Sequence, residues 1–210
     1  MIRILIADDH AIVRSGLKQI LEEDREMKIV AEHSNGIDAL NWLHTNNCDV
    51  VLLDISMPGK SGIDVLKQLH DEKPKLPVIV ISIYPEDQYA VRLIKAGAAG
   101  YLTKESAPGV IVGAVRQVAS GKKYINATVA EMLADEFGAQ NKKLPHEILS
   151  DREYQIFLLL ASAKTATEIA ASLGLSVKTI STYRSRILEK MHLRNNAELM
   201  RYVVDKHLTE

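Results

Sequence analysis

Five short apolar runs, rich in β-branched residues, alternate with longer segments of helical period across the first 104 residues. The runs are too short to be buried helices, and most are continuously apolar instead of alternating with polar residues. Strands that are buried on both faces of a parallel sheet have this pattern. The spacing predicts a doubly wound (βα)5 domain of the α/β class, with strands at 2–7, 28–31, 50–53, 78–82 and 100–103.

Apolar residues recur at helical spacing between these strands. One face of a helix at 36–44 is expected to be shared by Ile37, Leu40, Leu43 and His44. A further helix is expected at 108–120, because Pro108 occupies its first turn and Gly121 follows its last residue. Proline near the start and glycine after the end are the preferred order for helix termini.

Helical periodicity weakens after residue 120, and glycine, lysine, asparagine and proline collect at 138–145. Such a composition is typical of a connection between domains. The length of 210 residues accommodates two small domains. We therefore expect a domain at 1–120, a linker at 121–148 with one short helix near 128–137, and a second domain at 149–210.

The second domain is predicted to be all helical. In three places a capping side chain precedes a glutamate by three residues, and at this spacing the two can satisfy backbone N–H groups reciprocally. A glycine-containing turn at 173–176 separates the second and third helices, as in a helix-turn-helix. The capping pairs are Ser150 with Glu153, Thr165 with Glu168 and Asn195 with Glu198, and the four helices are expected at 151–161, 166–173, 177–191 and 196–207.

Composition excludes several other classes of protein. Hydrophobic residues make up 47% of the chain and charged residues 25%, which argues against collagen-like, coiled-coil and wholly disordered chains. The single cysteine, Cys48, cannot form an internal disulfide. No apolar run approaches the roughly 18 residues needed to span a bilayer, so we expect a cytoplasmic protein that is neither exported nor embedded in a membrane.

Chemically active side chains follow several of the predicted strands. Asp8 and Asp9 end the first strand and Asp54 ends the third. Ser82 ends the fourth strand, and Lys104 follows the fifth. Open α/β sheets place functional groups at the carboxyl ends of their strands, so these side chains are expected to converge. Converging carboxylates suit a divalent cation such as Mg²⁺, beside which an aspartate can accept a phosphoryl group.

The first domain resembles the receiver domain of two-component response regulators. The segments that carry the resemblance are Asp-Asp-His at 8–10, Asp-Ile-Ser-Met-Pro-Gly-Lys-Ser-Gly at 54–62, Ser82, and Gly-Ala-Ala-Gly-Tyr-Leu-Thr-Lys at 97–104. The resemblance implies that a sensor histidine kinase transfers a phosphoryl group to Asp54. It also implies that the receiver assists only its own phosphorylation and dephosphorylation, so the chain is not expected to be an enzyme in the ordinary sense.

Carried over by position, the resemblance also implies a Mg²⁺ site, which phosphorylation requires. Asp9, Asp54 and the Ser56 carbonyl would ligate the ion, and Asp8 would act through water.

The resemblance further implies a phosphoryl-binding pair and a switch. Ser82 and Lys104 would bind the phosphoryl group, and Ser82 would vacate space into which the aromatic ring of Tyr101 can rotate. Ile83 departs from the family pattern, in which a small residue most often follows the hydroxyl residue. Its bulk is expected to slow phosphorylation by small phosphodonors and to prolong the life of the phosphoryl group.

Basic residues concentrate on the third predicted helix of the second domain. The formal net charge of the whole chain is -1, but residues 149–210 carry +2 and the first 148 residues carry -3. Residues 176–194 hold five basic residues and one acid. Ile180, Ile187 and Met191 form an apolar stripe expected to face the core, which leaves basic and hydroxyl side chains on the other faces. A helix of this kind can lie in the major groove of DNA.

The second domain resembles a LuxR-type helix-turn-helix through residues 149–153, 167–170, 175–180 and 189–191. Together the two domains resemble a NarL/FixJ-type response regulator. The resemblance implies a transcription regulator that binds double-stranded DNA through a recognition helix at 177–191 and forms a homodimer when phosphorylated or DNA-bound. We expect base contacts from Ser181, Thr182 and Ser185, phosphate contacts from Lys178, Thr179, Tyr183 and Arg186, and dimerisation through Leu199, Tyr202 and Val203, with Val204 beside them.

Two other functions fit parts of the pattern. A Mg²⁺-dependent phosphatase could use Asp54 as its nucleophile, but it would want a second carboxylate two residues later, where this chain has Ser56. A protein-binding switch could use the helical domain for a protein partner, and duplex binding that weakens with salt would distinguish DNA binding from it.

Regulation of DNA binding could take two forms. The receiver can cover the recognition helix until phosphorylation separates the domains, or phosphorylated receivers can dimerise.

Overall fold

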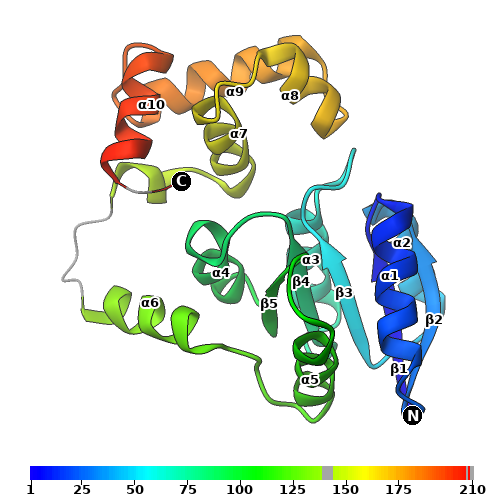
Figure 1. Cartoon of the computed structure of the whole chain (residues 1–210). Coiled ribbons are helices and arrows are strands. Elements are labelled where there is room, and N and C mark those ends of the chain that lie inside the picture. Colours follow the sequence, from blue (N-terminus) through cyan, green and yellow to red (C-terminus); the bar gives the residue numbers. More distant parts are fainter. Residues whose placement is uncertain (139–143, 207, 209–210) are drawn as a thin grey trace. The chain divides into compact units, whose positions relative to one another are not determined.

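The computed structural model describes residues 1–138, 144–206 and 208 (Figure 1). Residues 139–143 of the predicted linker and His207 of the last predicted helix lie outside the described residues. The chain divides into two compact units, Met1–Asp135 and Glu136–Glu210. Across the described ranges, no helix combines the length and apolarity that crossing a membrane requires.

The first unit is built on a five-stranded parallel sheet with the strand order β2-β1-β3-β4-β5. A helix follows each strand, so the predicted (βα)5 fold is confirmed. The strands are β1 (Ile2–Ala7), β2 (Met27–His33), β3 (Val50–Asp54), β4 (Val78–Ser82) and β5 (Gly100–Thr103). The helices are α1 (Ala11–Glu22), α2 (Gly36–Thr45), α3 (Gly62–Glu72), α4 (Glu86–Lys95) and α5 (Pro108–Ala119), followed by α6 (Ala127–Gly138).

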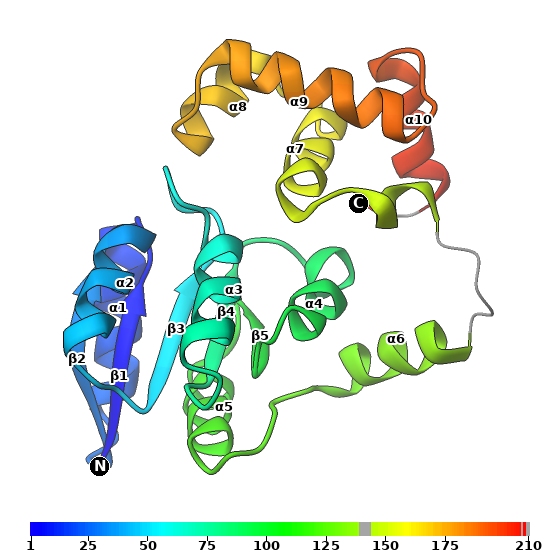
Figure 2. The same ribbon diagram turned by 180° about the vertical axis from the view of Figure 1, so that it is seen from behind.

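Helices cover both faces of this sheet. α1 and α5 pack together on one face, and α2 and α3 lie on the other (Figures 1 and 2). The core face of α2 is formed by Ala39, Leu40 and Leu43, whereas Ile37 is 53% exposed. The expectation that Ile37 and His44 share this face is wrong. His44 is also exposed, and at 3.6 residues per turn both residues lie roughly 90–110° from the centre of the buried arc.

The chain beyond α5 returns to the edge of the sheet. Tyr124 forms an isolated parallel bridge with Gly100, and its N–H donates to the Ala99 carbonyl at 2.7 Å. The Asn126 side-chain amide donates to the Glu86 carboxylate at 2.7 Å. The first part of the predicted linker is therefore held to the sheet by hydrogen bonds.

The second unit contains a short 3₁₀ helix and four α-helices. Residues 153–160 of α7 are all buried, so this helix forms the centre of the unit. α8 ends at Gly174, whose φ of 62° is the left-handed conformation that glycine adopts readily and that opens the tight turn to α9. The elements are η1 (Pro145–Ile148), α7 (Asp151–Ala161), α8 (Ala166–Leu173), α9 (Val177–Lys190) and α10 (Asn196–Asp205).

Two of the three predicted capping boxes are confirmed. Both hydrogen bonds form at Ser150 with Glu153 and at Thr165 with Glu168. At the start of α10 only half of the predicted box forms: Asn195 Oδ1 accepts from the N–H of Glu198 at 3.0 Å. The carboxylate of Glu198 accepts instead from the N–H of Arg194 at 2.8 Å, one residue before the cap.

The 3₁₀ helix η1 packs within the second unit through His146. This side chain is buried, and its Nδ1 atom lies 2.9 Å from the hydroxyl of Tyr202 on α10. The ring of His146 also contacts the ring of Tyr154 on α7. The last residues of the predicted linker therefore belong to the packing of the helical unit.

Candidate functional site

Two buried aspartates share one lysine at the carboxyl end of the sheet. Asp54 ends β3, Asp8 follows β1 and Lys104 follows β5, so the parallel topology brings the three together. The Lys104 Nζ atom lies 2.8 Å from Asp54 Oδ2 and 2.7 Å from Asp8 Oδ2. The side chains of Asp8 and Asp54 are 2% and 0% exposed, so the ammonium group is their main source of compensating charge.

Burial sets the ionisation of this cluster. It raises the pKa of Asp54 above its ordinary value, against the opposing effect of Lys104, and the nearby Asp8 carboxylate adds to the rise. Burial alone would lower the pKa of Lys104, but the carboxylates of Asp54 and Asp8 outweigh it and raise that pKa. Lys104 is therefore a permanent cation beside a carboxylate that is poorly solvated.

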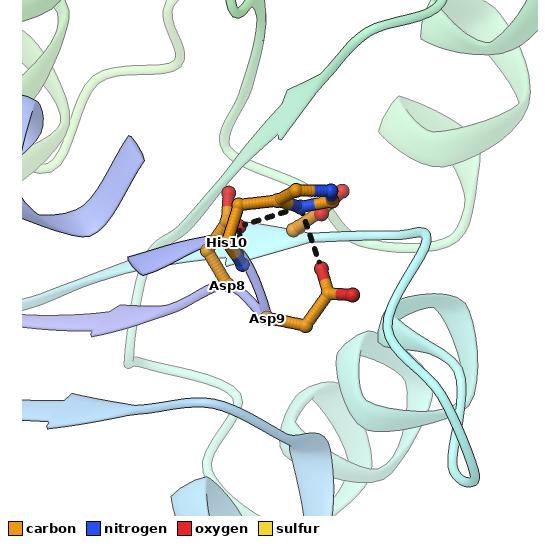
Figure 3. A group of neighbouring side chains, drawn as sticks. Asp8, Asp9 and His10 are labelled. Atoms are coloured by element: carbon orange, nitrogen blue, oxygen red, sulfur yellow. Dashed lines mark hydrogen bonds and ion pairs between the residues drawn. The ribbon is translucent and has the colours of Figure 1, made fainter. Parts of the chain in front are cut away.

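Asp9 and His10 extend the cluster toward solvent (Figure 3). The Nδ1 atom of His10 lies 2.8 Å from Asp9 Oδ1 and 3.3 Å from Asp8 Oδ1. The backbone N–H of His10 donates to Asp8 Oδ1 at 2.7 Å, and Arg14 donates to the Asp8 carbonyl at 2.6 Å. Sequence reasoning did not give Arg14 a role, because nothing in its local pattern shows that its guanidinium reaches the end of β1.

The residues present fit a divalent metal ion. One ligand atom from each of Asp8, Asp9, His10 and Asp54 can be chosen so that all lie within 4.8 Å of one another. Three of these residues offer the hard oxygen ligands that Mg²⁺ prefers. Ser56 adjoins the group, since its N–H donates to Asp54 Oδ1 at 3.0 Å. The geometry brings together Asp8, Asp9 and Asp54 of the residues predicted for the metal and adds His10 to them.

Ser82 and Tyr101 are connected through the residue that lies between them in space, Tyr84. The N–H of Tyr84 donates to Ser82 Oγ at 3.1 Å, and the Tyr101 hydroxyl donates to the Tyr84 carbonyl. Ser82 is fully buried, and Tyr101 is 2% exposed. Ile83, between Ser82 and Tyr84 in the sequence, is 65% exposed. Tyr101 therefore occupies an inward position in this structure.

The polar face of α9 is a second candidate site, on the helical unit. Ile180 and Ile187 are buried, whereas Ser181, Thr182 and Ser185 are exposed to solvent. Beside them lies a hollow of about 300 Å³ at the start of the helix. Its lining combines hydroxyl groups, one aromatic ring and two cations: Ser176, Lys178, Thr179, Thr182, Tyr183 and Arg186.

The basic residues near α9 are not all available to a ligand. Lys190 lies 2.7 Å from the carboxylate of Glu153 on α7, and Arg184 donates to the side chain of Asn196. Lys178 and Arg186 have no acidic partner among the residues that the structure describes. The positive charge that can face a polyanion is therefore concentrated at Lys178 and Arg186.

The exposed face of α10 differs from the expected one. Leu199 and Val203 are 0% and 1% exposed and pack inside the unit against α7, and Tyr202 bonds His146. The expectation that Leu199 and Val203 are available for dimerisation is therefore wrong, because they pack in the core of their own unit. Tyr202 is half-buried. Val204 is 64% exposed on the other side of the helix.

Two protein families match the two units. Residues 4–116 match the response regulator receiver domain, and residues 147–203 match the bacterial regulatory proteins of the luxR family.

Known proteins resemble the chain over nearly its whole length. The response regulator UvrY of Escherichia coli strain K12 is 38% identical over 200 residues, which are 95% of this chain and 92% of UvrY. The response regulator GacA of Pseudomonas aeruginosa is also 38% identical over 200 residues, 95% of this chain and 94% of GacA. A structure of RcsB from Salmonella enterica serovar Typhimurium, bound to promoter rprA with the phosphomimetic BeF₃⁻, has a TM-score of 0.67 at 25% identity and covers 97% of this chain and 98% of RcsB.

Proposed function

The chain belongs to the response regulators that join a receiver domain to a LuxR-type DNA-binding domain, and from this we propose that phosphorylation of Asp54 by a histidine kinase controls its sequence-specific binding to double-stranded DNA. The observation that carries the proposal is the buried Asp54 carboxylate, 2.8 Å from the ammonium group of Lys104. That carboxylate lies on a chain whose other unit exposes a helix with a basic and hydroxyl-rich face.

The phosphoryl transfer follows from the arrangement around Asp54. An oxygen of Asp54 attacks the phosphorus atom of the kinase phosphohistidine, and the P–N bond breaks as the new O–P bond forms. Lys104 and Ser82 then contact oxygens of the acyl phosphate. The chain assists only this reaction on itself and the later hydrolysis.

Mg²⁺ would be held by Asp9, Asp54 and the Ser56 carbonyl, with Asp8 acting through water. When bound, the ion neutralises charge on the transferring phosphoryl group. The clustering of these carboxylates supports this assignment. His10 lies where it would have to turn outward or become a further ligand.

Phosphorylation would then change the loop after β4. Ser82 moves toward the phosphoryl group, and the Tyr84 backbone that bonds both Ser82 and Tyr101 moves with it. A small shift at packed groups selects between two arrangements of the surface. The change either uncovers the recognition helix or joins two receivers.

DNA binding is assigned to α9. Base edges are contacted by Ser181, Thr182 and Ser185. Backbone phosphates are contacted by four of the six residues that line the hollow, Lys178, Thr179, Tyr183 and Arg186. A homodimer formed through α10 would have to use its exposed side, where Val204 lies.

The proposal is tested by phosphorylation and by occupancy of DNA. Wild type incubated with acetyl phosphate and Mg²⁺ is expected to gain one phosphoryl group by intact-protein mass spectrometry. Asp54→Ala is expected to gain none, and Asp71→Ala, which changes an exposed aspartate of α3, to match wild type. Genome-wide binding should differ between wild type and Asp54→Ala; equal occupancy would refute control of DNA binding by this residue.

The two forms of regulation make different predictions. If occlusion operates, residues 145–210 alone bind DNA better than the unphosphorylated full chain. If receivers dimerise, phosphorylation raises the oligomeric state of the full chain in sedimentation, and the isolated residues bind no better than the unphosphorylated chain.

A further inference from the structure

The three hydroxyl side chains assigned to base contacts share one hydrogen-bonding state. Ser181 Oγ donates to the Val177 carbonyl at 3.0 Å, and Thr182 Oγ1 donates to the Lys178 carbonyl at 3.0 Å. Ser185 Oγ donates to the Ser181 carbonyl at 3.1 Å. A carbonyl oxygen has no proton to give, so in each pair the hydroxyl must be the donor.

In this state, each hydroxyl can accept further hydrogen bonds but cannot donate one. A hydroxyl carries one proton and two lone pairs, and the proton is used within the helix. All three side chains are exposed, so their free lone pairs face outward. At these three positions, α9 therefore offers only hydrogen-bond acceptors to a ligand.

The major groove presents few donors to such a face. Adenine offers its N6 amino group and cytosine its N4 amino group, whereas guanine N7 and O6 and thymine O4 are acceptors. Two acceptors placed opposite each other gain nothing and lose their hydration. Turning a hydroxyl outward to serve guanine would give up its bond to the helix, at a cost of about two- to ten-fold in affinity for each position.

The cations nearby have the opposite character. Lys178 and Arg186 are donors only, and they line the hollow at the start of the helix without an acidic partner in the described chain. Phosphate oxygens suit them as ligands. Donors and acceptors are thus separated on α9: the cations suit the backbone, and the three hydroxyls suit amino groups on the bases.

Resting on the DNA-binding function proposed above, we propose that Ser181, Thr182 and Ser185 read DNA as hydrogen-bond acceptors and select operator positions that present the amino groups of adenine or cytosine. At the positions that the three residues face, the operator half-site is accordingly enriched in adenine or cytosine on the strand that each residue contacts.

The test begins with selection of binding sequences from a pool of randomised duplexes, using the full chain with Mg²⁺ and acetyl phosphate. In the selected duplex, single adenines are then replaced by purine, which lacks the N6 amino group, and single cytosines by 2-pyrimidinone, which lacks the N4 amino group. Removing an amino group that faces one of the hydroxyls should weaken wild-type binding about three- to ten-fold. Ser181→Ala, Thr182→Val or Ser185→Ala should each lose this sensitivity at one position.

A donor placed on the same face should reverse the preference. Lysine has three donors and no acceptor, so Ser185→Lys should select guanine at the position where wild type selects adenine or cytosine. Ser162→Ala is the matched control, because Ser162 Oγ makes the same kind of bond, to the Leu158 carbonyl at 3.0 Å, but directly follows α7 and not α9. It should select the same sequences as wild type.

The outcomes separate this inference from the function on which it rests. If no duplex is bound in a salt-dependent way, the DNA-binding function fails, and the inference fails with it. If binding is salt-dependent and sequence-selective but removing amino groups changes affinity less than two-fold, the acceptor assignment is overturned and DNA binding stands. A wild-type preference for guanine on the contacted strand at these positions would overturn it equally.

Discussion

The phenolic hydroxyl of Tyr101 donates a hydrogen bond to the backbone carbonyl of Tyr84 at 2.7 Å. The same Tyr84 uses its N–H to bond Ser82 Oγ, so one residue connects the proposed phosphoryl-binding hydroxyl to the aromatic ring of β5. Burial raises the pKa of Tyr101, and the hydroxyl therefore remains a donor throughout the physiological range. The loop after β4 holds both groups through its backbone.

Removing that donor should destabilise the first unit. Tyr101→Phe leaves the Tyr84 carbonyl without this partner and is expected to lower the free energy of unfolding by about 1–2 kcal/mol. Urea unfolding followed by the fluorescence of Trp42, the only tryptophan, measures this unit. Tyr124→Phe is the control, since the Tyr124 hydroxyl has no hydrogen bond within the described residues, and it should change stability by less than about 0.5 kcal/mol.

Lys104→Met should expose the repulsion between Asp8 and Asp54. Both carboxylates stay buried while their cation is lost, so the free energy of unfolding at pH 7 should fall by about 2–4 kcal/mol. The change raises the folded-state pKa of Asp54 further, and the deficit should therefore shrink as the pH falls through that value. Trp42 fluorescence in urea from pH 8 to pH 5 tests this. Lys75→Met, at an exposed lysine, should show neither effect; a deficit independent of pH would contradict the explanation.

The ion pair of Glu153 with Lys190 should make the helical unit sensitive to acid. Burial alone would raise the pKa of Glu153, but the hydrogen bonds from Lys190 and the Ser150 N–H outweigh it and lower that pKa. The stabilisation is therefore present above the unfolded-state pKa of about 4.3 and lost as the pH falls through the folded value. Glu153→Gln should cost about 1–2 kcal/mol at pH 7 and little at about pH 3.

Hydrogen exchange of α7 amides at several pH values reports on this unit. Asp205→Asn removes an exposed pair with Arg201, and it should cost less than about 0.5 kcal/mol at any of these pH values. If Glu153→Gln still lowers the free energy of unfolding at low pH, the contact with Lys190 is stabilised by packing and not by charge.

Gly62→Ala should disturb the strand that carries the phospho-acceptor. A Cβ atom at Gly62 would lie 1.9 Å from the Asp54 carbonyl oxygen and 2.7 Å from Ile55 Cα, and backbone atoms cannot give way cheaply. We expect a loss of about 1–3 kcal/mol by urea unfolding, with slower phosphorylation. Gly113→Ala, where a Cβ meets nothing within 4 Å in α5, should stabilise the unit by about 0.5–1 kcal/mol. Equal effects of the two substitutions would contradict the steric argument.

Ile83→Ala should speed both the gain and the loss of the phosphoryl group. The exposed side chain follows Ser82 at the rim of the site, where its bulk limits the approach of small phosphodonors and of water. Rates of phosphorylation by acetyl phosphate and of hydrolysis are measured by mass spectrometry. Ile37→Ala, an exposed isoleucine of α2, should leave both rates unchanged. If both rates are unaltered in Ile83→Ala, the bulk of Ile83 does not control phosphorylation or hydrolysis.

The acidic site could be anticipated because parallel strands end at one edge of the sheet. Asp8, Asp54 and Lys104 are far apart in sequence, but each follows a strand, and topology alone brings them together. Residue spacing could not predict the orientation of the side chains around these three residues. That Arg14 reaches the Asp8 carbonyl and that Tyr101 lies inward depend on side-chain packing.

In the helical unit, hydrophobic periodicity predicts which residues are buried but not what buries them. An apolar stripe on α10 predicts that Leu199 and Val203 are covered, but not whether their cover is a second copy or the same unit. For a similar reason, the count of positive charge near α9 could not show which cations are paired within the unit. Lys190 is neutralised by Glu153, 37 residues away, and local sequence does not reveal such a partner.

The bridge between Tyr124 and Gly100 has a consequence for solubility. β5 is an outer strand of the sheet, and the unpaired backbone groups of such a strand are a template for pairing with another molecule. The Tyr124 backbone occupies the first of these groups, through the N–H that bonds Ala99. Residues 121–126 thus cover one end of this edge, and a receiver cut after Ser120 would expose that end to pairing with another molecule.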